Sequence, residues 1–283
     1  MKYENRREVE LLVLSDIHLG TYGCHANELV YYLKSIRPKT LVLNGDIIDM
    51  WQFSKKYFPN SHMAVLKEIL RMLSHGAQVY YITGNHDELL RRFAGMNFGN
   101  LTIDNKLVLN LDGKKTWIFH GDVFDVSMKY SKWLAKLGGK GYDILILMNR
   151  WINKWSERLG KGKISLSKKI KESVKSAVKY ISDFEDIAIN LAMEKDFDNV
   201  ICGHIHQPTI REINRNGKKI TYLNSGDWIE NLTSLEYHRG EWSLVHFEQN
   251  HLNFEFSDLK LDESVEASYQ ELFAAFSFEL QKS

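Results

Sequence analysis

The chain has 283 residues, of which 44% are hydrophobic and 26% charged, and its formal net charge is only +1. This composition is typical of a globular protein with a sizeable core and excludes a disordered or collagen-like chain. Its two cysteines cannot build a disulfide framework, which favours a reducing compartment. The amino terminus has no apolar stretch typical of a secretory signal, and no apolar run is long enough to cross a bilayer. The sequence therefore predicts a cytoplasmic protein.

The first part of the chain predicts strands that alternate with helices. Apolar runs of strand length lie at 11–14, 41–43 and 78–82, and their continuous apolar character is typical of buried parallel strands. Apolar residues at helical spacing lie between them, over 26–36 and 63–73. In such an arrangement the strands end at one edge of the sheet, where open α/β folds bind their ligands.

Further strands are predicted towards the carboxyl end. Short runs between 101 and 119 precede a long helical stretch, and an apolar run at 200–202 follows it. Four alternating runs between 209 and 247, separated by glycine-containing turns, predict antiparallel strands. Residues 261–280 place apolar side chains on one helical face, which would dock on its own domain or on a second subunit.

Five of the predicted strands end in side chains that can bind metal ions. Each group alone has an ordinary explanation, such as a turn aspartate, a helix cap or a surface histidine. Five such coincidences at one sheet edge are improbable, so we expect the groups to converge. Oxygen and imidazole ligands without cysteine suit Mn²⁺, Fe or Zn²⁺, and two-metal sites catalyse displacement at phosphorus. In chain order the groups are Asp16 with His18, Asp46 with Asp49, Asn85 with His86, His120, and His204 with His206.

These residues carry a resemblance to a known family. The order Asp-x-His, Gly-Asp-x-x-Asp, Gly-Asn-His-Asp, His-Gly-Asp and Gly-His-x-His, over roughly residues 9–247, resembles that of the calcineurin-like metallophosphoesterases. The resemblance implies a mixed α+β or α/β fold, a four-layer α-β-β-α sandwich with a helical lid insertion. It also implies two divalent metal ions, with Mn²⁺ favoured and Fe or Zn²⁺ as alternatives.

The resemblance assigns a role to each matching residue. Asp46 would bridge the two ions. His86 would contact the scissile phosphoryl group and act as a general acid, and Asp49 would hydrogen-bond His86 and set its tautomer. The remaining residues would hold the ions in two groups, which are Asp16, His18 and His206 around one ion and Asn85, His120 and His204 around the other.

A closer resemblance lies within that family. Segments 15–20, 45–49, 181–185 and 224–228 resemble the UDP-2,3-diacylglucosamine hydrolases, which cleave a nucleotide–sugar pyrophosphate in lipid A synthesis and release UMP and the lipid 1-phosphate. The best-known branch has Arg where this chain has His86, so the resemblance is to a His-bearing branch. It implies a phosphorylated lipid or nucleotide-linked substrate. The alternatives are a generic phosphodiesterase or protein phosphatase, and a non-catalytic binding member of the fold.

The predicted organisation is a core with an insertion. We expect residues 1–122 and 196–250 to form the metallophosphoesterase core, 123–195 a basic amphipathic helical lid, and 251–283 a C-terminal extension with an amphipathic helix. Residues 123–182 carry a net charge of +10, which leaves −9 for the remainder.

The positive charge of the insertion indicates which kinds of partner it could bind. Cationic faces beside apolar ones suit a phosphorylated amphiphile or an anionic membrane surface, so a peripheral contact with the inner membrane is a further expectation. An ordinary two-helix hairpin with solvated lysines is the alternative. We expect no nucleic acid partner, because no recognised binding motif accompanies the basic residues.

Overall fold

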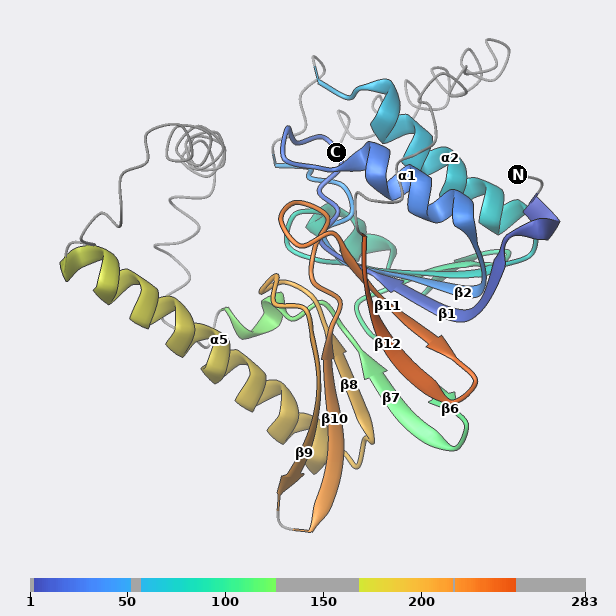
Figure 1. The fold of residues 1–283 in the computed structure, drawn as a ribbon. Coiled ribbons are helices and arrows are strands. Elements are labelled where there is room, and N and C mark those ends of the chain that lie inside the picture. Colours follow the sequence, from blue (N-terminus) through green and yellow to red (C-terminus); the bar gives the residue numbers. More distant parts are fainter. Residues whose placement is uncertain (1–2, 52–56, 126–167, 216, 248–283) are drawn as a thin grey trace. The chain divides into compact units, whose positions relative to one another are not determined.

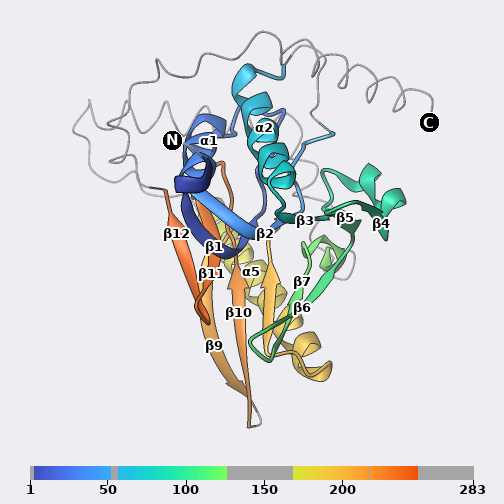
Figure 2. The same cartoon turned by 90° about the vertical axis from the view of Figure 1, so that its right-hand side faces the viewer.

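The computed structural model describes residues 3–51, 57–125, 168–215 and 217–247. All of them belong to one unit of the chain, Met1–Phe247. Their strands form two sheets (Figures 1 and 2).

The first sheet has seven strands. They are β1 (Arg7–Leu14), β2 (Ile36–Asn44), β3 (Gln78–Ile82), β4 (Met96–Phe98), β5 (Leu101–Asp104), β11 (Thr233–His238) and β12 (Glu241–His246). Their order across the sheet is β12-β11-β1-β2-β3-β5-β4. Strands β1, β2, β3 and β5 run parallel to one another, so β1, β2 and β3 direct their carboxyl ends to one edge.

The second sheet has five strands. They are β6 (Leu107–Leu111), β7 (Lys114–Ile118), β8 (Asn199–Cys202), β9 (Thr209–Arg215) and β10 (Lys218–Asn224). Their order is β6-β7-β8-β10-β9, with β7, β8 and β10 parallel. The carboxyl ends of β7 and β8 therefore also share one edge.

The described helices are three α-helices and three short 3₁₀ helices. The α-helices are α1 (Ala26–Ser35), α2 (Asn60–Ser74) and α5 (Lys168–Glu194), and the 3₁₀ helices are η1 (Tyr3–Asn5), η2 (Glu88–Phe93) and η3 (Asp122–Phe124). None of the helices that the structure describes is long and apolar enough to cross a membrane.

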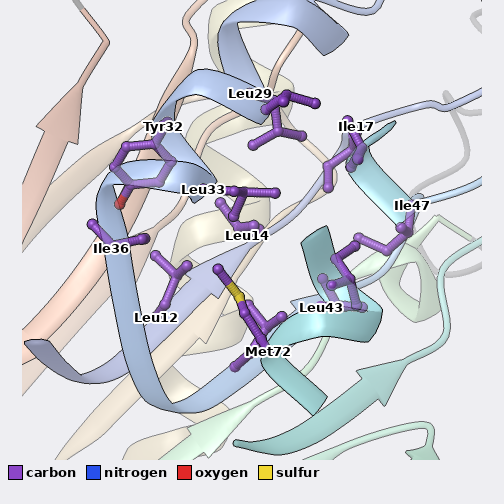
Figure 3. Packing of buried hydrophobic residues seen from close by; sticks show 14 of the residues in the cluster. Leu12, Leu14, Ile17, Leu29, Tyr32, Leu33, Ile36, Leu43, Ile47 and Met72 are labelled. Atoms are coloured by element: carbon purple, nitrogen blue, oxygen red, sulfur yellow. The ribbon is translucent and has the colours of Figure 1, made fainter. Parts of the chain in front are cut away.

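Helices α1 and α2 cover one face of the first sheet. Their apolar stripes follow the 3.6-residue period, so Leu29 and Leu33 of α1 face the sheet together. These side chains join Met72 of α2 in one buried cluster with Leu12 and Leu43 of the strands (Figure 3).

Helix α5 covers the outer face of the second sheet (Figure 1). There Phe184 joins Tyr222 in a second buried cluster. The inner faces of the two sheets share a third cluster, in which Val42 of the first sheet meets Ile118 and Ile201 of the second. The layers therefore follow the order helix, sheet, sheet, helix, which confirms the predicted four-layer α-β-β-α sandwich.

The structure corrects the expectation of a single sheet edge and adds detail that the sequence analysis does not contain. The five ligand-bearing strands do not end at the edge of one sheet, because β1, β2 and β3 belong to the first sheet and β7 and β8 to the second. The Asp112–Gly113 turn pairs β6 with β7 and so begins the second sheet, a choice that apolar patterning alone does not encode. Segment 88–93 is a 3₁₀ helix, and the exposed strand β4 was not predicted.

The predicted domain boundaries stay a prediction. Helix α5 lies within the predicted lid, 123–195, but residues 126–167 of that lid lie outside the described part of the chain. The predicted C-terminal extension, 251–283, also lies outside it.

Histidine 62 of α2 holds the loop that follows β1. Its Nδ1 atom accepts a hydrogen bond from the backbone N–H of Gly20 at 2.9 Å, and the residue is only 2% exposed. Burial lowers the pKa of His62 from 6.5 to about 4. A protonated Nδ1 could not accept this hydrogen bond, so the contact requires neutral imidazole.

We expect His62 to make stability pH-dependent. Between pH 6.5 and about 4, the unfolded chain protonates His62 while the folded chain does not, so the free energy of unfolding falls as the pH falls. The change reaches about 3 kcal/mol for a shift of this size. His62→Asn keeps an acceptor but does not titrate, so urea denaturation should show the wild type losing more stability than this variant between pH 7 and pH 4. Parallel losses in the two proteins would contradict the assignment.

Candidate metal centre

The loops at the carboxyl ends of five strands meet across the two sheets. Within the first sheet, the N–H of Asp16 donates to the carbonyl of Gly45 at 3.0 Å and the N–H of His18 donates to the carbonyl of Asp46 at 2.9 Å. Between the sheets, the side-chain amide of Asn44 donates to the carbonyl of Phe119 at 3.2 Å. Backbone and side-chain hydrogen bonds thus fix the loops before any metal ion is considered.

Three of the predicted ligands form a first group. Potential ligand atoms of Asp16, His18 and His206 all lie within 4.8 Å of one another. His206 Nε2 is 3.1 Å from Asp16 Oδ1. The first sheet supplies two members and the loop after β8 supplies the third.

A second group surrounds Asp46. Potential ligand atoms of Asp46, His120 and His204 lie within 4.8 Å of one another. Asp46 Oδ2 is 3.2 Å from His120 Nε2 and 4.0 Å from His18 Nε2 of the first group. One carboxylate oxygen therefore faces histidines of both groups, which is the geometry that a bridging ligand requires.

His86 also faces this carboxylate. Its Nε2 lies 4.0 Å from Asp46 Oδ2, and its potential ligand atom groups with those of His18 and Asp46 within 4.8 Å. Distance alone therefore does not separate a metal ligand from a residue that contacts substrate at this position.

Two buried polar atoms point to a cation. Among the described residues, the Nε2 atom of His18 and the Oδ1 atom of Asn85 have no hydrogen-bond partner. Leaving a buried polar atom unpaired destabilises a fold by about 1–3 kcal/mol. Both atoms are lone-pair donors in their ligating forms, so divalent cations would satisfy them, and the residues fit a binuclear metal site.

Backbone strain is concentrated here. Asp16, His18, Asp46, His204 and His206 all have positive φ, between 51° and 65°. Non-glycine residues in this left-handed region are uncommon and cluster at functional sites, where the surrounding structure over-determines them. These residues lie in three loops, those after β1, β2 and β8, and the strained backbone turns their side chains towards one point.

Each predicted histidine ligand has a polar partner near its second nitrogen. Such partners fix the tautomer and the ring orientation of a ligating histidine. They are the carbonyl oxygen of Asn44 for His120 (2.9 Å), Asp49 for His18 (3.4 Å), Asp125 for His204 (3.0 Å) and, more distantly, Asp227 for His206 (3.9 Å).

Charge complementarity sets the ionisation of the centre. Burial would raise the pKa of Asp46, yet His120, with His18 and His86, holds it well below its usual range. Burial would lower the pKa of His206, yet Asp16 raises it to about 9. The carboxylates are therefore ionised at neutral pH and available as ligands.

The structure brings Asp49 and His86 together. His86 Nδ1 lies 2.9 Å from Asp49 Oδ2, and the indole of Trp51 packs on the imidazole with ring centroids 4.4 Å apart. Burial would lower the pKa of His86, but its hydrogen bond to Asp49 and the charge of Asp46 raise it. Protonated His86 is stabilised at the mouth of the site, as a general acid requires.

Sequence reasoning missed three residues that support the site. Asp87 accepts hydrogen bonds from the N–H groups of Gly84 (2.6 Å) and Ile47 (2.9 Å) and so joins the loops after β2 and β3. Its place in the Gly-Asn-His-Asp motif could have signalled this role. Asp125 and His62 lie outside every motif, and only the structure shows their contacts.

Two glycines allow the loops to approach closely. An added Cβ at Gly45 would lie 2.3 Å from His120 Nδ1, and one at Gly84 would lie 2.2 Å from Asp46 Oδ1. Gly45 also has φ of +79°. Any larger residue at either position must displace a predicted metal ligand.

We expect Gly45→Ala to lower metal content. Gly113 is a matched control, because its φ is +82° and an added Cβ there meets nothing within 4 Å. Gly45→Ala and the control Gly113→Ala should each lose about 1–2 kcal/mol of stability, because alanine is strained in the left-handed backbone conformation. Only Gly45→Ala should also displace His120 and lose bound metal, measured as ions per chain by elemental analysis. Equal metal content in the two variants would contradict the predicted role of His120.

The chain is similar to known proteins over most of its length. A model of the calcineurin-like phosphoesterase family matches residues 9–208. UDP-2,3-diacylglucosamine hydrolase from Aliivibrio fischeri is 26% identical over 239 residues, covering 83% of this chain and 97% of its own length. The protein of that name from Stenotrophomonas maltophilia is 22% identical and covers 82% of this chain and 96% of its own length. A solved archaeal phosphodiesterase is 14% identical with a TM-score of 0.40, over 83% of this chain and 98% of its own. The family model spans most of the chain and all five motif blocks up to His206, and the chain belongs to the calcineurin-like phosphoesterases.

Proposed function

We propose that the chain is a two-metal hydrolase that cleaves the pyrophosphate of UDP-2,3-diacylglucosamine to UMP and the lipid 1-phosphate, in lipid A synthesis. The observation that carries the reaction class is Asp46 Oδ2, which faces His120 at 3.2 Å and His18 at 4.0 Å. The substrate rests on the names of the relatives, whose length the chain covers almost completely.

Asp16, His18 and His206 would hold one metal ion, His120 and His204 with Asn85 would hold the other, and Asp46 would be shared between them. Two divalent cations, most suitably Mn²⁺, would neutralise charge on the phosphoryl oxygens and lower the pKa of the attacking water. Asp46 also joins the loops after β1 and β3, because its backbone carbonyl accepts from the N–H of His18 and its Oδ1 accepts from the N–H of His86 at 2.8 Å.

His86 acts on the leaving group. With Nδ1 held by Asp49 at 2.9 Å, its Nε2 is the nitrogen that can donate a proton to a leaving oxygen. Asp49 keeps the ring oriented and stabilises its protonated form, since the pKa of Asp49 is itself lowered, despite burial, by hydrogen bonds from His18 and His86.

His86 also supports a second candidate function, that of a generic phosphodiesterase. A phosphate leaving group has a pKa near ~6 and needs little help from an acid, whereas an alkoxide needs much more. A histidine poised as a general acid therefore suits ester substrates as well as a pyrophosphate.

The proposal also covers the location of the enzyme and a contact between its basic segment, residues 123–182, and the membrane. A cytoplasmic enzyme with a peripheral contact to an anionic membrane would meet such a lipid where it is made, and the +10 charge of residues 123–182 favours that contact. Most of those residues lie outside the described part of the chain.

Product analysis tests the proposal directly. With Mn²⁺ present, the protein should release UMP and the lipid 1-phosphate from UDP-2,3-diacylglucosamine, and a chelator should abolish release. Asp46→Ala should lose at least one of two bound ions and nearly all activity. A bis-nitrophenyl phosphate assay in parallel separates the outcomes: if this diester is cleaved but the UDP-lipid is not, the metal centre stands and the substrate assignment fails.

We expect His86→Ala to retain both ions and to lose about 10²–10⁴ in rate on phosphodiesters with poor leaving groups. The loss should shrink as the pKa of the leaving group falls, because a good leaving group departs without a proton. Metal analysis with a leaving-group series measures both effects. Loss of an ion would make His86 a ligand, and an equal rate loss on every ester would indicate electrostatic stabilisation instead.

A further inference from the structure

Helix α5 reaches the metal centre through two side chains that the proposed reaction does not use. The hydroxyl of Tyr180, on α5, donates to Asp125 Oδ1 at 2.6 Å. The same carboxylate oxygen lies 3.0 Å from His204 Nε2. The Tyr180 hydroxyl is itself 3.5 Å from that nitrogen, so the three side chains form one compact cluster.

This cluster decides which nitrogen of His204 faces a cation. Asp125 is paired with Nε2 at 3.0 Å, so Nδ1 is the nitrogen of His204 that would bind a cation in the group with Asp46 and His120. A carboxylate on the outer nitrogen fixes the tautomer and makes the ligating nitrogen more basic, and loss of such a partner typically lowers metal affinity by about 10–100-fold.

The partner of His204 differs from those of the other predicted ligands. His120 is held by the carbonyl oxygen of Asn44, at the end of β2, and His18 by Asp49, in the loop after β2. Both of these partners therefore lie at the end of β2 or in the loop that follows it, outside the predicted lid. Asp125 is instead bonded to a residue of α5, a helix of the predicted lid.

A second contact of α5 supports the same link. Phe184 lies one helical turn after Tyr180 and therefore on the same face of α5. It is fully buried, and its ring centroid is 6.1 Å from that of His204. Gly121 is next to His120, and an added Cβ there would lie 2.5 Å from the Phe184 ring. Helix α5 therefore also packs directly against the loop that carries His120.

We propose that Asp125 and Tyr180 are positioning residues for His204, through which α5 sets the metal affinity of the position shared by Asn85, His120 and His204. The inference rests on the proposed binuclear centre. It makes the two metal positions unequal: one is held by core loops alone, and the other also depends on where α5 places the Tyr180 hydroxyl.

The direct test is metal binding by the full-length chain. The proteins are stripped with a chelator and titrated with Mn²⁺ by calorimetry, and their Co²⁺ forms are compared by visible absorption. The variants are Asp125→Asn and Tyr180→Phe, each close in shape to the original residue. Val178→Ala is the control, since Val178 lies on the same helix with its side chain 60% exposed.

We expect Asp125→Asn to weaken one of the two Mn²⁺ sites by about 10–100-fold and to leave the other unchanged. Tyr180→Phe should weaken the same site by about fivefold, because it removes one hydrogen bond to the carboxylate that orients His204 but leaves the carboxylate in place. One of the two Co²⁺ absorption components should shift in both variants, while Val178→Ala matches the wild type.

Several results would overturn the inference. Wild-type affinities in both variants, or equal weakening of both sites, would show that Asp125 does not act through His204. An effect of Asp125→Asn without any effect of Tyr180→Phe would remove the link to α5. A wild-type protein that binds no metal would instead refute the proposed centre itself, which keeps the two failures distinct. If Asp125→Asn fails to fold, Tyr180→Phe alone decides, because it removes a single hydroxyl.

Discussion

The site depends on one buried carboxylate, that of Asp46. It is 2% exposed, and it faces His120 at 3.2 Å and both His18 and His86 at 4.0 Å. Burying an ionised carboxylate without compensation is strongly unfavourable, so the fold must supply positive charge or hydrogen bonds around it. The partners come from loops on both sheets, and the sandwich has to close for this carboxylate to be accommodated. Fold and site are therefore specified by the same contacts.

The residues of this centre could be predicted because metal chemistry restricts side-chain type. An aspartate, an asparagine or a histidine directly after an apolar run is visible in the sequence, and five such groups leave few alternative explanations. The meeting of two sheets could not be predicted in the same way. Strands β3 and β7 have similar apolar patterns, yet one pairs in the first sheet and the other in the second. The pattern reports burial, while the choice of partner strand depends on long-range packing.

The supporting residues were harder to predict, for a different reason. Asp87, His62 and Asp125 each act through one hydrogen bond or a few, made to a loop that is distant in sequence or to a ligand. A carboxylate or an imidazole on a helix or at its end has many ordinary explanations, and no periodicity marks the one that faces inwards. The left-handed backbone at Asp16 and His204 is equally invisible, since neither residue type requires positive φ. Such features follow from the closed structure and not from local preference.

The two predicted metal positions differ in the groups that support their histidines. On the side of His18 the supporting group is Asp49, which also contacts His86, so the predicted ligand and the proposed general acid share one carboxylate. On the side of His204 the supporting carboxylate is shared with a helix. If Asp125 and Tyr180 position His204 as proposed, metal binding at this position would depend on α5, a helix of the predicted lid. That dependence would be a physical means by which the predicted lid could influence the metal centre without contributing a ligand.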